Sequence, residues 1–150
     1  MSKRLVVSSL AALAAVTAGT VVFVSSADAA VPAKPEISKA TAHYTVPVGG
    51  GASLTFSATV ADNSGVKSLR VLAWPARSGL APTAAEIRDV EEATCTATSA
   101  TVSKCTYTVK NSAREAASLP EGVWHVSALV TAKDHDTTFA PQAATFTVRR

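Results

Sequence analysis

The sequence predicts an all-β fold, an antiparallel sandwich of about seven strands with one or two short helices in its connections. Apolar and polar residues alternate with a period of two over many short segments, which is typical of half-buried strands. Asp, Asn, Gly and Pro separate these segments, as they do in turns. The strand–helix–strand rhythm of a parallel sheet is missing, so neighbouring strands are expected to be antiparallel.

The strands are expected where this alternation, or a weaker form of it, occurs. These segments are residues 42–46, 53–60, 66–74, 94–98, 104–110, 124–132 and 144–148. In the second segment Leu54, Phe56 and Val60 share one face, and serines and threonines occupy the other. The turn Asp62-Asn63-Ser64-Gly65 follows it. The third segment carries apolar residues on both faces and ends at Trp74, so both faces are expected to be covered.

Two capping boxes predict the short helices. Thr83-Ala84-Ala85-Glu86 precedes Ile87 and Val90, a spacing that predicts a helix of about two to three turns. Glu91-Glu92 is then interpreted as part of its solvated face. Ser112-Ala113-Arg114-Glu115 predicts a second short helix before the next strand.

Cys95 and Cys105 are the two cysteines of the chain, and a turn rich in small polar residues lies between them. We predict that they form a disulfide that joins two neighbouring strands. Closing so short a loop should stabilise the fold by somewhat under about 3 kcal/mol. A redox or metal site would need a closer cysteine spacing or further ligands.

The last two strands complete the expected sandwich. Val126 lies on the apolar face of the strand 124–132, and Phe146 on that of the strand 144–148. We expect both to meet Phe56 between two sheets, and Trp74 and Trp124 to pack in the core. Seven short strands with alternating faces are typical of an immunoglobulin-like sandwich.

Parts of the chain resemble known extracellular modules. The turn Asp62-Asn63-Ser64-Gly65-Val66 and the segment from Trp124 to Asp134 are similar to bacterial immunoglobulin-like and fibronectin type III-like domains. A family of small secreted actinobacterial proteins of unknown function is similar at Leu72-Ala73-Trp74-Pro75, at Cys95, Cys105 and Tyr107, and at Asp136-Thr137-Thr138-Phe139. The resemblance covers about residues 38–150 and implies a sandwich without implying an activity. Antibody domains differ, because their disulfide joins two strands that carry no cysteine here.

The N-terminus has the layout of a secretory signal peptide. Lys3 and Arg4 precede an uncharged, largely apolar stretch, and Ala27-Asp28-Ala29 offers small residues at the cleavage site. We therefore predict a signal peptide at 1–29, an extended Pro-spaced linker at 30–38 and the sandwich domain at 39–150. The alternative is an uncleaved membrane anchor. The predicted location is secreted, with no membrane association after cleavage.

Five residues in two turns are the candidates for an ion site. Asp62 and Asn63 lie in one turn, and Asp134, His135 and Asp136 lie in another. In an immunoglobulin-like sandwich both turns lie at the same end, so three carboxylates could gather into a weak calcium site. The alternative is that Asp and Asn occur there because turns favour them. No other cofactor or metal is expected.

We interpret the protein as a secreted, non-catalytic binding module for an extracellular protein or a cell-surface polymer. The formal charge of +3 is spread along the chain, without the basic clusters that nucleic-acid binding needs. Neither a Gly-x-Ser-x-Gly elbow nor a phosphate-binding loop is present. The insert 76–93 is expected to contact the partner, with Arg77, Ser78, Gly79 and Leu80 as the candidate loop. Alternatives are a protease inhibitor that presents this loop, and a hydrolase with a dispersed site.

Overall fold

The computed structural model describes residue 31 and residues 33–149 of the 150-residue chain. The predicted signal peptide at 1–29 lies outside these residues. The first strand begins at Glu36, so the last residues of the predicted linker already belong to the sandwich. This strand runs from Glu36 to Thr45, so it starts six residues before the predicted segment 42–46 and is longer than that segment.

Seven strands, one α-helix and two 3₁₀ turns follow one another along the described residues. The strands are β1 (Glu36–Thr45), β2 (Ala52–Ala61), β3 (Val66–Pro75), β4 (Thr94–Ala97), β5 (Val102–Asn111), β6 (Gly122–Ala132) and β7 (Thr137–Val148). The helix α1 spans Ala113–Ser118, and the 3₁₀ turns η1 and η2 span Ala76–Ser78 and Glu86–Asp89. The predicted all-β fold is confirmed.

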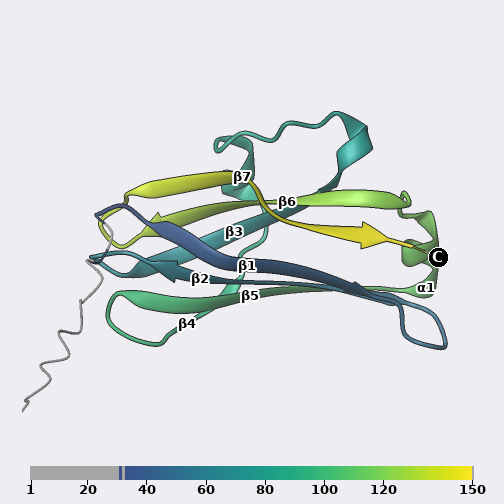
Figure 1. Cartoon of the computed structure of the whole chain (residues 1–150), viewed down its shortest axis with the longest axis horizontal. Helices are drawn as coiled ribbons and strands as arrows, with labels where there is room; N and C mark the ends of the chain where they lie inside the picture. Colours follow the sequence, from purple (N-terminus) through teal and green to yellow (C-terminus); the bar gives the residue numbers. More distant parts are fainter. Residues whose placement is uncertain (1–30, 32, 150) are drawn as a thin grey trace, which may run out of the picture.

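The strands form two antiparallel sheets that lie one over the other (Figure 1). The four-stranded sheet has the order β1-β2-β5-β4, and the three-stranded sheet has the order β3-β6-β7. If the strands are lettered A to G along the chain, these sheets are ABED and CFG. That is the strand arrangement of immunoglobulin constant-type sandwiches.

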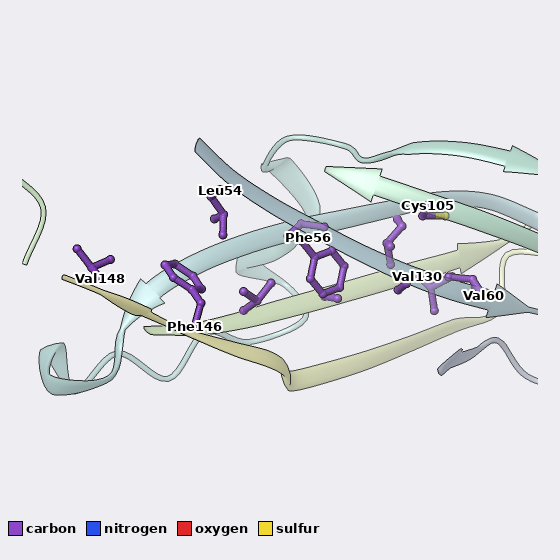
Figure 2. Close-up of a cluster of buried hydrophobic side chains, with 12 residues drawn as sticks. Leu54, Phe56, Val60, Cys105, Val130, Phe146 and Val148 are labelled. Atoms are coloured by element: carbon purple, nitrogen blue, oxygen red, sulfur yellow. The ribbon is translucent and has the colours of Figure 1, made fainter. Parts of the chain in front are cut away.

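The core lies between the two sheets (Figure 2). Phe56 and Val126 are each 0% exposed there and Phe146 is 8% exposed, so the predicted meeting of these residues is confirmed. Along β2 buried and half-buried residues alternate without interruption. The alternation of apolar and polar residues therefore decides which face of β2 is buried, as the sequence predicted.

A second, smaller apolar layer covers the outer face of the three-stranded sheet. Trp74, Leu129 and Ile87 are buried there outside the main core, and the indole Nε1 of Trp74 donates to Ser127 Oγ at 2.9 Å. In Figure 1 the teal segment that follows β3 runs above β6 and β7. The expectation that both faces of β3 are covered is confirmed, whereas Trp74 packs on the outer face and not in the main core.

The helix predicted after Thr83 is wrong in type and length. Both hydrogen bonds of its capping box form, from Thr83 N to Glu86 Oε2 at 2.8 Å and from Glu86 N to Thr83 Oγ1 at 3.4 Å. Only the 3₁₀ turn η2 follows, because Val90 is extended. The next residues pair with the edge of β3: Val71 N donates to Glu91 O, and Ala93 N donates to Leu69 O. Glu91 and Glu92 are thus exposed on an extended segment and not on a helix.

The second predicted capping box does open an α-helix. Ser112 Oγ accepts from Glu115 N, and a Glu115 carboxylate oxygen accepts from Ser112 N at 2.7 Å. The helix α1 ends after one and a half turns because Leu119 is extended. It links β5 to β6 at one end of the sandwich (Figure 1).

β7 is longer than predicted because it contains a bulge. Val126 of β6 faces Ala144, but Ala128 faces Ala140, so β7 holds extra residues between these pairs. Pro141 lies in this bulge, where its lack of an N–H removes no ladder bond. Its carbonyl accepts from Ser127 Oγ at 2.7 Å. The proline breaks the alternation that would have revealed the first half of the strand.

Candidate functional site

The interior of the sandwich is open along one side because β4 is short. β4 pairs with β5 only from Ser103 to Thr106, so the rest of β5, Tyr107 to Asn111, has no strand beside that edge among the described residues. The extended segment at Glu91 meets the edge of β3 only near Leu69 and Val71. Between these two edges the sheets leave an opening. On the opposite side, β1 and β7 lie against each other.

A pocket of about 470 Å³ extends from this opening into the core. Ligand pockets in proteins typically measure about 300–1,000 Å³. The lining is mostly apolar and comes from both sheets. Its aliphatic part includes Leu54, Val71, Ala73, Val109, Leu119 and Val148.

Three aromatic rings form one wall of the pocket. Tyr44 of β1 stacks on Phe146 of β7 with ring centroids 5.9 Å apart, and Trp124 of β6 stacks on the same phenyl ring at 5.8 Å. The indole Nε1 of Trp124 donates to Pro120 O at 2.9 Å, which fixes the orientation of that ring. Trp124 remains partly exposed although it belongs to the core, because it faces the pocket.

The mouth of the pocket is polar. The phenol of Tyr107 donates to Glu91 Oε2 at 2.7 Å, and Asp89 and Asn111 also line the opening. Partial burial, then the hydrogen bond to Glu91 and then the charge of that carboxylate, raise the pKa of Tyr107 well above its ordinary value. Tyr107 therefore stays a neutral hydroxyl and a donor across the physiological pH range.

The two turns predicted to share one end of the sandwich do lie together. Lys133 N donates to Gly65 O at 2.9 Å, and Asp134 N donates to Ser64 Oγ at 3.2 Å. The second turn also holds His135 in the left-handed region, with φ of +74°. The predicted juxtaposition of the turns is confirmed.

The predicted gathering of their carboxylates is wrong. Within the described residues no group of three or more acidic, His or Cys side chains is placed to hold a metal ion. Asp62 is buried, and its Oδ1 accepts from Ser64 N and Ser64 Oγ, whereas Asp134 Oδ1 accepts from Asp136 N. Asn63, Asp134, His135 and Asp136 are exposed. The acidic side chains serve their own turns, as Asx residues commonly do.

The candidate partner loop is exposed but is not extended. Arg77, Ser78, Gly79 and Leu80 are all exposed, and η1 winds the first two of them into a 3₁₀ turn. Ser78 Oγ donates to Pro75 O at 2.7 Å, and Gly79 adopts φ of +70°. A loop that entered a protease cleft as an extended strand would first have to unwind this turn.

The predicted disulfide is confirmed. Cys95 and Cys105 face each other across β4 and β5 and are bonded, with their Cα atoms 4.0 Å apart. Cys105 is 1% exposed and belongs to the core cluster. The bond therefore fastens β4 to the half of the sandwich that is closed.

A comparison with models of protein families assigns the chain to a family. The model of the Family of unknown function (DUF5707) matches residues 37–130. The chain belongs to this family. The matched region runs from β1 into β6 and includes Tyr44, Tyr107 and Trp124 of the pocket. No curated protein and no solved structure matches the chain.

Among the residues that the structure describes, no helix combines the length and the apolar composition that a membrane crossing needs.

The pocket was not predicted from the sequence. The sequence does carry a signal for the pocket. The predicted strand 94–98 is too short to pair with all of its neighbour, 104–110. The residues of that neighbour that lie beyond the end of the shorter strand, Tyr107 and Val109, line the pocket.

Proposed function

We propose that the protein is a secreted, non-catalytic binding module that holds a small, largely apolar molecule in the pocket between its sheets. The pocket carries this proposal, because it is a hollow of about 470 Å³ within an interior that is otherwise packed. Apolar side chains that face an unfilled space forfeit dispersion contacts. A hollow of this size thus has no benefit for stability, but a ligand could fill it.

The rigidity of the scaffold supports the same proposal. The pocket walls are strands of two sheets, and the stacked rings of Tyr44, Phe146 and Trp124 are fixed by their neighbours. A preformed apolar site loses little conformational entropy when a ligand enters it. The open side between β3 and β5 supplies the entry path.

Secretion is supported by two independent features. The positive residues Lys3 and Arg4, the uncharged stretch after them and Ala27-Asp28-Ala29 have the order of a cleavable export signal. The disulfide between Cys95 and Cys105 is of the kind that persists in oxidising compartments outside the cytosol.

The test is to fill the pocket and measure binding of N-phenylnaphthylamine, a neutral probe that fluoresces in apolar surroundings. Val109→Phe should weaken binding by about tenfold or more, because its ring enters the pocket. Thr147→Phe is the matched control and should leave the affinity unchanged, since Thr147 is exposed on the face of β7 opposite to that of the lining residue Val148. Failure of the unmodified protein to bind the probe, or equal losses in both variants, would contradict the proposal.

A further inference from the structure

The charges at the pocket mouth are all of one sign. Asp89 and Glu91 line the opening, and none of the described residues that line the pocket is basic. The chain as a whole carries a formal charge of +3, so this local excess of carboxylates runs against its average. The potential at the entrance therefore favours a cation and disfavours an anion.

Arg70, a basic residue near the mouth, already has two acceptors other than Glu91. Arg70 forms an ion pair with Glu92, with Nη2 and Oε1 2.6 Å apart, and its other terminal nitrogen donates to Val90 O. Because Glu91 and Glu92 are consecutive on an extended segment, their side chains point to opposite sides. Arg70 thus neutralises Glu92, which is not part of the pocket lining, and leaves Glu91 to the mouth.

The hydrogen bond from Tyr107 orients Glu91 without neutralising it. The donor is a phenol, which carries no charge at neutral pH, so the bond brings no positive charge to Glu91. The bond holds the carboxylate over the opening at 2.7 Å from the phenolic oxygen. Behind it the lining becomes aliphatic and aromatic, and aromatic faces also attract cations.

We infer that the ligand of this pocket is a small soluble amphiphile, with an apolar body that lies between the sheets and a cationic head that lies at Asp89 and Glu91. The inference rests on the proposed binding function and adds the charge and the orientation of the ligand. A purely apolar ligand would leave the two carboxylates unused, and an anionic one would be repelled.

Three probes with the same tail test the inference: decylamine, decanol and decanoate, each below its micellar concentration at neutral pH. Trp74→Phe leaves Trp124 as the reporting indole, because Trp74 lies on the outer face of the sheet and Trp124 lines the pocket. We expect decylamine to bind about five- to tenfold more tightly than decanol, and decanoate more weakly than either.

Variants of the mouth assign this preference to its carboxylates. In Asp89→Asn/Glu91→Gln the affinities for decylamine and decanol should agree within about twofold, with the decanol affinity unchanged. Glu92→Gln is the matched control and should keep the preference, because Glu92 faces Arg70. In the Trp74→Phe protein, added salt should weaken the binding of decylamine and leave that of decanol unchanged, which tests the charge even if the double variant folds poorly.

The outcomes separate the two proposals. Equal binding of all three probes, or tighter binding of decanoate, would overturn the inference and leave the binding function in place. Absence of binding by all three would contradict the function itself.

Discussion

The half of the interior beside the disulfide is closed, whereas the half beside α1 is open to solvent. In the closed half Val60, Leu69 and Val130 are each 0% exposed. In the open half Val109 and Leu119 hold equivalent core-facing positions and remain half-buried. A valine on the inward face of the four-stranded sheet, Val60 or Val109, thus reaches a different environment in each half.

The difference in burial comes from which part of the sheet edge is covered by β4, and not from the alternation of apolar and polar residues. β4 and its bond to Cys105 close the edge of the four-stranded sheet over part of β5 only. At Glu91 the chain crosses to the edge of β3, and beyond that point neither edge is paired with another strand in the part of the chain that the structure describes. Solvent access to a sandwich interior is thus governed by the length of one edge strand.

The largest expected effect contrasts truncations in the two halves. Val60→Ala should lower the free energy of unfolding by about 2–4 kcal/mol, because it leaves a cavity in the closed half. Val109→Ala should lower it by less than about 1.5 kcal/mol, because that side chain already borders a space that water can enter. Urea titration of both variants checks this. Similar losses would mean that the two halves are packed alike.

Removal of the disulfide sharpens the contrast. Cys95→Ala/Cys105→Ala should lower the free energy of unfolding by about 2–3 kcal/mol, since the bond closes a loop with a sequence separation of 10. Faster amide hydrogen exchange should be confined to β4 and its partner residues Ser103 to Thr106. If exchange increases equally on β6 and β7, the bond stabilises the whole sandwich and does not act on its closed half in particular.

The smallest effect concerns α1 at the open end. Ser112→Ala should lower the melting temperature by about 2–4 °C. Hydrogen bonds from the Ser112 amide, then from its hydroxyl, lower the pKa of Glu115 below 4.5. Because the folded pKa is the lower one, this stabilisation is complete above pH 4.5 and is lost as the pH falls through the folded pKa. The difference between the unmodified protein and Ser112→Ala should therefore shrink in acid.

Thr83→Ala is the comparison for this variant, since the capping box of Thr83 and Glu86 has the same hydrogen bonds but opens only η2. It should leave the binding of N-phenylnaphthylamine unchanged, because η2 contributes only Asp89 to the pocket lining and this probe carries no charge. Ser112→Ala should weaken that binding by about twofold, because α1 positions Leu119 in the pocket lining. Equal binding by both variants would show that α1 has no part in shaping the pocket.

Local chemistry explains which predictions from the sequence are confirmed. The alternation around Phe56 allows one face to be buried, and the pairing of two lone cysteines needs only the proximity of two neighbouring strands. The cap at Ser112 depends on atoms within one helical turn. Each of these features is decided over a few residues, so the sequence alone predicts it.

Two of the three failures have a different, long-range cause. The segment after Thr83 has helical signals, but pairing of Glu91 and Ala93 with β3 draws it into an extended form. Asp62 and Asp134 lie in adjacent turns, but each carboxylate hydrogen-bonds within its own turn. Pro141 hides half of β7, since its bulge depends on the register with β6. Long-range pairing thus decides the segment after Thr83 and the bulge at Pro141, whereas hydrogen bonds within each turn decide the two carboxylates.

By itself the sequence therefore determined most of the strands, their buried faces and the disulfide, because each depends on the spacing of residues close along the chain. The tertiary structure alone decided that the interior is hollow at one end and that Glu91 and Tyr107 meet at its mouth. The cavity depends on where the packing between distant segments ends. No local sequence pattern shows at which residue of β5 its pairing with β4 stops.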